Sequence, residues 1–355
     1  MSTSKNVLPT SRLAPEGVIP LVDFEGSAYE CGKAYAKFTM KNYPGYREYL
    51  DMAYAWTSLD PEFKSVVEER TPYLLDLHRG IWEEAGPSQK PLKSHSSNLR
   101  ASIDDCTSFG IAGDQTVDGY PLSGQTKDTP LDRIDLYIVL RMRIEEGPTL
   151  LVLCYPGETL GYGIWSTGMS LYRNNLYSTA GREGGMSFKD WGMMTLAGSS
   201  IDESIELVNR FGLQGFGNCL IMDGEGKSTS IEWNAGGIDV LPAENGICTH
   251  ANHPIGPATS PYLGVDGSEL SCSVHRTFGL RKKLIADRGR LTPQLVLSIL
   301  SDHTDYPNGG ICRHRKEEGF TDCITTAAVI SEPTRGKLHV VRGNPCSNWP
   351  VTYTL

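Results

Sequence analysis

The chain has 355 residues and a net charge of −9, with 39% hydrophobic and 21% charged residues. A chain of this length buries a sizeable apolar core, in one large domain or two. The negative charge argues against nucleic acids and anionic membranes as partners, because both select basic surfaces. The nine cysteines are scattered and odd in number, and the N-terminus lacks an apolar signal core. Together these features predict a cytoplasmic protein with reduced thiols.

The first part of the chain is expected to be helical after a short lead. Residues 1–17 are expected to be disordered, and residues 18–355 to form a single domain. A strand is predicted over 19–24, a helix over 28–41, and further helix over 45–85. The residues that follow are polar and rich in proline and serine, which predicts a surface loop shortly before Cys106.

From Cys106 onward the pattern changes to strands and hairpins, with helices between them. Thr292 and Pro293 supply a cap and a first-turn proline for one of these helices. Helices, then hairpin strands, then helices and strands fit a layered α+β domain. Strands are predicted over 106–112, up to 128, over 136–142, 149–155, 231–233, 238–240, 325–330 and 338–341, a hairpin over 161–176, and helices over 199–211, 276–287 and 292–301.

The segment around Cys106 is the strongest candidate for a catalytic site. Cys106 begins a short strand, and Asp118 and Gly119 supply a hairpin turn, because Asp-Gly tolerates the positive φ that such turns need. The returning strand ends near Asp128, so the hairpin is expected to bring this carboxylate beside the cysteine. A nucleophile and a carboxylate at matching strand ends suit catalysis. On spacing alone, a buried cysteine with a structural role is the simpler interpretation.

Short motifs in a consistent order support the catalytic interpretation. They are Gly26–Gly32, Glu69–Tyr73, Arg79–Ile81, Cys106–Ser108 with its hairpin, Leu122–Gln125 with Asp128, Thr249–His253, Asp305–Pro307 and Ile311–Arg313. These motifs resemble the isopenicillin N acyltransferase (acyl-coenzyme A:6-aminopenicillanic acid acyltransferase) family, whose members are autoproteolytic N-terminal nucleophile (Ntn) hydrolases. Each match is weak alone, and their collinearity is the specific signal.

The resemblance implies a four-layer αββα sandwich and self-cleavage between Asp105 and Cys106. Cleavage gives a small subunit of residues 1–105 and a large subunit of residues 106–355. The freed α-amino group of Cys106, with a pKa of roughly 7.7–8.0, then serves as the base for its own thiol. The thiolate takes up an acyl group as a thioester. Its transfer to water or to a second amine distinguishes an amidohydrolase from an acyltransferase.

The expected substrates are small N-acyl amines or amino acids. No cofactor is expected. The expected partners are the small-molecule amide and the second subunit made from the same precursor, and a homo-oligomer is compatible with the sequence.

One departure from the family concerns the cleavage site. The family carries glycine before the nucleophile, whereas this chain has Asp105. A carboxylate at this position either assists the acyl shift or slows it. The departure therefore leaves the rate of cleavage open, rather than its position.

The resemblance also implies further site residues. Asn252 is expected to donate its side-chain amide to an oxyanion hole. Asp128 is expected to orient the α-amine or to polarise Cys106, and Thr107 to hydrogen-bond to the same centre. Taken alone, Asn252 has the simpler interpretation of a turn residue. Asn175, at the end of a predicted hairpin, is expected to contact the substrate.

Thr321 and Asp322 are also expected to contact the substrate. The family places a Ser-Arg pair just before the late strand, where this chain has Thr321 and Asp322. An acid in place of a base predicts a preference for a cationic amine over an anionic one. A shift of the alignment by a few residues explains the difference equally well.

Two other functions remain open at this point. A relative that keeps the fold and an intact chain would be a binding protein. His275 and His303 suit an unrelated Cys-His thiol hydrolase, although no papain-type active-site sequence surrounds any of the cysteines.

Two groups of histidine and cysteine suggest a metal site. They are Cys248 with His250 and His253, and Cys312 with His314. Neither group has the strong spacing of a structural zinc site, and packing and capping explain both more simply. No metal is therefore expected.

Overall fold

The structure is a computed structural model that describes residues 17–54, 61–86, 105–304, 306, 309–314 and 323–355. The expected disordered lead lies almost entirely outside these residues, as do most of the expected loop before Cys106 and both Thr321 and Asp322. The chain divides into two compact units, Met1–Ala101 with Asp135–Gly161, and Ser102–Ile134 with Tyr162–Leu355. We call them the helical unit and the two-sheet unit.

In the helical unit, the helices α1 and α4 cross with their backbones very close together. A Cβ atom added at Gly32 would lie 2.2 Å from the carbonyl oxygen of Leu77, and one at Gly80 would lie 2.2 Å from that of Tyr29. Only glycine permits so close an approach. The elements are β1 (Leu21–Gly26), α1 (Ala28–Asn42), η3 (Pro44–Tyr46), α2 (Arg47–Tyr54), α3 (Pro61–Arg70), α4 (Pro72–Ala85), β4 (Ile138–Ile144) and β5 (Thr149–Cys154).

The strands of the helical unit join segments that are far apart in the sequence. β1 pairs in parallel with β4, from Leu21 opposite Val139 to Gly26 opposite Ile144, and β4 pairs antiparallel with β5. Asp23 on β1 forms ion pairs with Arg141 and Arg143 on β4, so charge also links the two strands.

The two-sheet unit contains a six-stranded sheet in the order β11-β2-β3-β12-β13-β14. The hairpin β2–β3 lies inside this sheet, and its register places Asp105 opposite Asp128 and Cys106 opposite Lys127. A β-bulge interrupts the pairing of β12 with β3 between Thr325 and Ala327. The strands are β2 (Asp105–Ile111), β3 (Leu122–Pro130), β11 (Ile247–His250), β12 (Cys323–Glu332), β13 (Lys337–Arg342) and β14 (Val351–Thr354).

Five strands of the same unit, β6 to β10, follow one another in sequence order in a second sheet. The strands β7 to β10 are joined by antiparallel pairings, and nearly all their residues between Gly217 and Asn234 are buried. The strands are β6 (Tyr162–Trp165), β7 (Ser170–Asn174), β8 (Gly217–Met222), β9 (Ser228–Asn234) and β10 (Gly237–Pro242).

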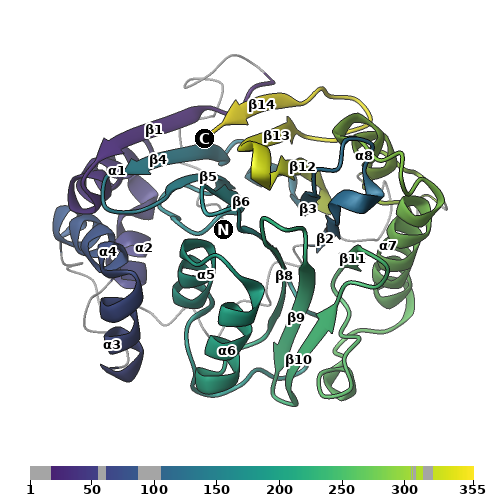
Figure 1. The fold of residues 1–355 in the computed structure, drawn as a ribbon, viewed down its shortest axis with the longest axis horizontal. Coiled ribbons are helices and arrows are strands. Elements are labelled where there is room, and N and C mark those ends of the chain that lie inside the picture. The colour runs from purple at the N-terminus through teal and green to yellow at the C-terminus, as the bar shows by residue number, and fades with distance from the viewer. Residues whose placement is uncertain (1–16, 55–60, 87–104, 305, 307–308, 315–322) are drawn as a thin grey trace. The chain divides into compact units, whose positions relative to one another are not determined.

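Helices cover the outer faces of the two sheets in this unit (Figure 1). α7 (Gly267–Ala286) and α8 (Pro293–Leu300) bury Leu280 and Val296 against Phe109 and Ile330 of the six-stranded sheet. On the other side, Phe188 of α5 (Phe188–Ala197) stacks on Trp233 of β9, and α6 (Ile201–Phe211) packs on α5. The order helix, sheet, sheet, helix confirms the predicted four-layer αββα arrangement within the two-sheet unit.

Several predicted elements need new bounds. β2 starts at Asp105, one residue before the predicted start at Cys106. α7 starts at Gly267 rather than at residue 276. The helical region after residue 45 is divided among α2, α3 and α4, whereas α6, α8, β12 and β13 match their predictions closely. None of the helices in the described residues is both long and apolar enough to cross a membrane.

Candidate active site

Cys106 lies between the two sheets. Side chains alternate along a strand, so Cys106, Ser108 and Gly110 share one face of β2. Ser108 accepts a hydrogen bond from Asn174 of β7, and a Cβ at Gly110 would meet Ser228 of β9 at 2.8 Å. Cys106 is fully buried on this face. The opposite face of β2 carries Asp105, Thr107 and Phe109 and is covered by α7.

A buried lysine contacts the thiol. Lys127 lies opposite Cys106 in the hairpin and donates a hydrogen bond from Nζ to Cys106 Sγ at 3.1 Å. The same ammonium donates to the Tyr162 hydroxyl at 3.1 Å and lies 4.5 Å from the centre of that ring. A cation beside a cysteine stabilises the thiolate, which is the nucleophilic form.

Arg276 of α7 binds the backbone and side chains around the cysteine from the helix face. It donates from Nη1 to the carbonyl oxygen of Cys106 at 2.5 Å and to Thr107 Oγ1 at 2.9 Å. It donates from Nη2 to Asn252 Oδ1 at 2.7 Å. The arginine is fully buried. The predicted contact of Thr107 with the centre is therefore made through this guanidinium.

Asp105 is anchored on the same side of the sheet. Its carboxylate accepts a hydrogen bond from the Tyr177 hydroxyl and pairs with the Arg313 guanidinium. Arg276 Nη2 lies 3.8 Å from Asp105 Oδ1. Asp105 is only 2% exposed, so the residue before the bond to Cys106 is buried and is held by two arginines and a tyrosine.

Asp128 lies opposite Asp105, not opposite the cysteine. Thr325 donates to its Oδ1 at 2.6 Å, and Arg276 Nη1 lies 3.9 Å from its Oδ2. Burial raises the pKa of Asp128 to about 6, against the opposing effects of Arg276 and the Thr325 hydrogen bond. The hairpin thus brings the predicted carboxylate to the site, where it shares Arg276 with Asp105 across the strand pair.

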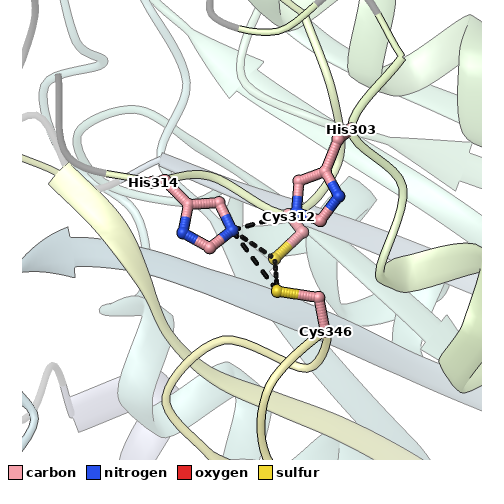
Figure 2. Close-up of side chains that lie close together, drawn as sticks. All are labelled: His303, Cys312, His314 and Cys346. Atoms are coloured by element: carbon pink, nitrogen blue, oxygen red, sulfur yellow. Dashed lines mark hydrogen bonds between the residues drawn. The ribbon is translucent and has the colours of Figure 1, made fainter.

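His303, one of the two histidines considered for a Cys-His pair, lies in another cluster. Its Nε2 is 2.9 Å from His314 Nε2, beside Cys312 and Cys346 (Figure 2). The structure therefore places His303 with a different pair of cysteines.

Asn252 holds the main-chain nitrogen of Cys106. Its Oδ1 accepts from Cys106 N at 3.1 Å, and its Nδ2 donates to the carbonyl oxygen of Asn175 at 2.9 Å. The orientation of the amide is fixed by Arg276, because a guanidinium carries only donors and must face the oxygen. Asn175 therefore reaches the site through its backbone carbonyl.

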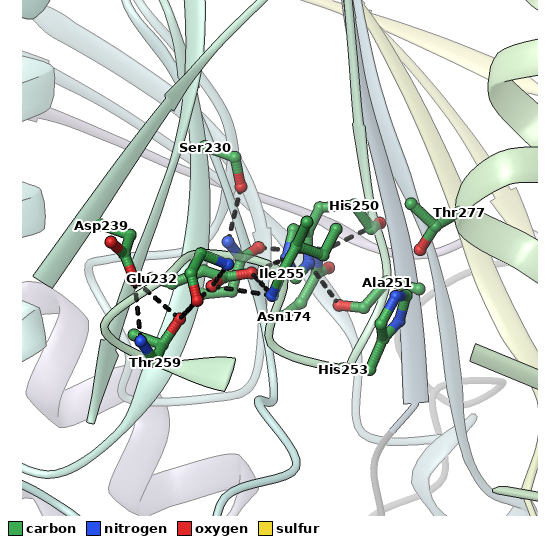
Figure 3. A network of polar contacts seen from close by, with 12 residues as sticks. Asn174, Ser230, Glu232, Asp239, His250, Ala251, His253, Ile255, Thr259 and Thr277 are labelled. Atoms are coloured by element: carbon green, nitrogen blue, oxygen red, sulfur yellow. Dashed lines mark hydrogen bonds and ion pairs between the residues drawn. The ribbon is translucent and has the colours of Figure 1, made fainter. Parts of the chain in front are cut away.

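A buried polar network fixes the loop that carries Asn252 (Figure 3). Glu232 of β9 accepts from Ile255 N at 2.8 Å and Gly256 N at 2.9 Å, and it contacts His250 Nε2 at 2.5 Å. Burial acts to raise the pKa of Glu232, but the hydrogen bonds from His250, Thr259 and Gly256 hold it below its ordinary value. Within the segment Thr249–His253, His250 thus helps to position the loop, and Asn252 contacts the nitrogen of Cys106.

Most of the predicted site residues meet in one connected set. Asp105, Cys106 and Thr107 come from β2, Asp128 from β3, and Asn252 from the loop after β11. No role was predicted for Lys127, Tyr177 or Arg276. For Arg276 the signal was present, because Cys272, Arg276, Leu280 and Leu284 recur every four residues on the buried face of one helix.

No protein-family model matches the chain, and no curated protein sequence matches it. Solved structures with some similarity include a mutant of the conjugated bile acid hydrolase from Clostridium perfringens, at 13% identity over 70% of this chain and 97% of that one, with a TM-score of 0.44. A second variant of that hydrolase has 12% identity, coverage of 72% and 92%, and a TM-score of 0.37. The penicillin V acylase from Agrobacterium tumefaciens has 9% identity, coverage of 70% and 77%, and a TM-score of 0.40. At these values the likeness decides neither fold nor activity.

Proposed function

We propose that this chain is the precursor of an N-terminal cysteine amidohydrolase of the Ntn type, related to the isopenicillin N acyltransferase family. The carrying observation is the placement of Cys106, whose thiol contacts Lys127 and whose main-chain nitrogen is held by Asn252. The nitrogen that cleavage would free as an α-amine already has a fixed acceptor. The buried lysine stabilises the thiolate that both maturation and turnover require.

Maturation is a self-acylation followed by hydrolysis. The Cys106 thiolate attacks the carbonyl carbon of Asp105, the C–N bond breaks, and the nitrogen of Cys106 takes up a proton as the new α-amine. Water then hydrolyses the thioester, which leaves a C-terminal carboxylate on Asp105 and a free thiol on Cys106. Arg276 supports this step, because it holds the Cys106 carbonyl and pairs with the Asp105 side chain.

Turnover repeats the same chemistry on a substrate. The α-amine of Cys106 takes the thiol proton, the thiolate attacks an amide carbonyl, and the protonated amine returns the proton to the leaving nitrogen. Water completes hydrolysis, and a second amine in its place would complete acyl transfer. The proposed substrates are small N-acyl amines or amino acids, and the proposed location is the cytoplasm.

A second candidate is a binding protein that keeps the chain intact. The anchoring of Asp105 by Tyr177, Arg313 and Arg276 favours it. A scissile residue held this firmly in a strand has little freedom to present its carbonyl to the neighbouring thiol.

The mass of the purified protein separates these two functions. We expect two tightly associated pieces, residues 1–105 and 106–355, with Cys106 at the start of the larger one. Cys106→Ala should remain a single chain, whereas Cys31→Ala, which changes a buried cysteine in the helical unit, should be cut like the wild type. An intact wild-type chain, or a new N-terminus other than Cys106, would contradict the proposal.

A screen of N-acyl amines and N-acyl amino acids then tests the activity itself. We expect the cut protein to release a free amine and a carboxylic acid from at least one of these classes, and Cys106→Ala to release neither. Cleavage without any such turnover would leave maturation in place but contradict the amidohydrolase.

A further inference from the structure

Four potential metal ligands meet at one point of the two-sheet unit. His303, Cys312, His314 and Cys346 each offer one donor atom, and these atoms lie within 4.8 Å of one another (Figure 2). They come from the segment after α8, the segment before β12 and the turn after β13. In the described residues this is the one group of three or more such side chains. Two of its members stand more than thirty residues apart, so spacing along the chain does not reveal it.

We propose that these four side chains form a zinc site with two thiolate and two imidazole ligands. Zn–S bonds near 2.3 Å and Zn–N bonds near 2.0–2.1 Å in a tetrahedron imply separations of about 3.8 Å between sulfurs, about 3.6 Å between sulfur and nitrogen, and about 3.3 Å between nitrogens. The two sulfurs are 3.6 Å apart. His314 Nε2 lies 3.6 Å from Cys312 Sγ, 3.3 Å from Cys346 Sγ and 2.9 Å from His303 Nε2.

The surroundings of the cluster support its ligands. Asn344 donates from Nδ2 to Cys312 Sγ at 3.4 Å and to the carbonyl oxygen of Arg313 at 2.7 Å. The carbonyl oxygen of Asp302, the neighbour of His303, accepts from Cys312 N at 3.0 Å. Hydrogen bonds from amides to a ligating sulfur orient the ligand and disperse its charge.

Charge also favours a divalent cation. Two thiolate ligands balance the charge of a divalent ion, so with two neutral imidazoles the site carries no net charge, and any ligand protons leave as the metal–sulfur bonds form. A disulfide between the same cysteines would require the removal of two electrons by an oxidant.

The site is structural rather than catalytic, because four protein ligands fill a tetrahedral zinc ion. Arg313 stands between the ligands Cys312 and His314, and its guanidinium pairs with Asp105. A bound ion therefore fixes the backbone of the residue that holds the proposed cleavage site. This last link rests on the proposed function, whereas the metal site itself does not.

Metal content of the full chain tests the site without any measurement of activity. Wild type, Cys346→Ser and the matched control Cys31→Ser are purified under reducing conditions without chelator, supplied with Zn²⁺, desalted, and measured by inductively coupled plasma mass spectrometry. We expect about one zinc per chain in the wild type and in Cys31→Ser, and, because loss of a ligand weakens binding about tenfold or more, a much lower zinc content in Cys346→Ser after desalting. Cys106→Ala should bind zinc like the wild type, so failure of the proposed cleavage leaves this result unchanged.

Cobalt provides an independent readout of the ligand set. Co²⁺ added to the metal-free wild type should give the intense visible absorption of a tetrahedral thiolate site. His303→Gln, a change at an exposed residue, should alter this spectrum while the circular dichroism stays that of the wild type. A wild type that binds neither ion, a Cys346→Ser variant that binds zinc as tightly as wild type, or a Cys312–Cys346 disulfide under reducing conditions would overturn the proposal.

Discussion

Arg276 shows how much of the site depends on a single buried charge. A guanidinium has five N–H donors and no acceptor, so it can satisfy several oxygens at once. Here it contacts the Cys106 carbonyl, Thr107 and Asn252, and it lies within 4 Å of the carboxylates of Asp105 and Asp128. Burial of a charge is costly unless such partners compensate it. Cys106, Asp128 and Asn252 could be named from motifs, but the residue that joins them could not, because its role depends on packing.

Asp128 should make stability depend on pH. Burial raises its pKa from 3.8 to about 6, so the folded chain keeps this proton to higher pH than the unfolded chain. The favourable contribution of the protonated group is complete below about pH 4 and is lost as the pH rises through about 6, which amounts to about 3 kcal/mol. In a Cys106→Ala background, Asp128→Asn should therefore gain about that much in unfolding free energy, relative to its parent, between about pH 4 and about pH 7.

Urea denaturation at several pH values measures this difference. Asp132→Asn, which changes an exposed carboxyl after β3, is the control and should track its parent at every pH. An Asp128→Asn effect that is the same at both ends of the range would mean that Asp128 is ionised throughout.

Asn252 should affect turnover, and its loss also removes one partner of the buried Arg276. If its amide stabilises the tetrahedral intermediate once the amine of Cys106 is free, Asn252→Ala should lower kcat about 100–1,000-fold, or about 2.7–4 kcal/mol of barrier. The assay uses matured protein and a substrate from the N-acyl amine screen, with circular dichroism to confirm the fold. Asn209→Ala, at an exposed position of α6, is the control. Wild-type turnover in Asn252→Ala would return this residue to a role in the turn.

At the level of elements, the hairpin that carries the nucleophile was the most predictable part of the fold. The Asp-Gly turn and the two strands were readable, yet the register differs by one residue from the simplest expectation. Asp128 was expected beside Cys106, but Lys127 occupies that position and Asp128 faces Asp105. Register depends on the turn and on the partner strands, and a shift of one residue moves a side chain to the other face of the sheet.

Other elements had no clear sequence signal. α5 and β8 received no prediction. β8 is buried throughout and α5 has no exposed residue, so both lack the contrast between buried and exposed positions on which periodicity depends. α7 was predicted to start late because its first turns carry Ser, Cys and His at buried and half-buried positions. The amphipathic α6, with one polar face, was predicted within two residues.

The crossing of α1 and α4 should be sensitive to a single methyl group. Gly32→Ala places a Cβ 2.2 Å from the Leu77 carbonyl oxygen, which forces the helices apart. We expect a loss of about 1–3 kcal/mol in unfolding free energy, as overpacking usually costs, measured by thermal and urea denaturation. At Gly45 a Cβ would meet nothing within 4 Å, so Gly45→Ala is the matched control and should be close to neutral. Equal effects of the two substitutions would contradict this close contact.

At the scale of the whole molecule, both products of the proposed cut contribute elements to the helical unit. The helical unit contains β1 and α1 to α4 from before the cut and β4 and β5 from after it. We therefore expect the two pieces to co-elute in size-exclusion chromatography at high salt and to separate only in denaturant. High salt weakens the ion pairs of Asp23 but leaves the β1–β4 hydrogen bonds and the buried contacts. Separation of the pieces in native buffer would contradict the shared unit.

The parallel pairing of β1 with β4 means that the proposed cleavage would change how readily the protein refolds. Before cleavage, the two strands belong to one polymer, so their meeting is intramolecular and does not depend on how dilute the protein is. After cleavage, the same pairing joins two molecules, and its recovery from denaturant becomes a second-order reaction. In the uncut chain, the covalent link thus helps the two strands to meet, and the proposed cleavage removes that link. Under the proposed cleavage, folding takes place once, in the single chain, and dilution opposes the refolding of the two separated products.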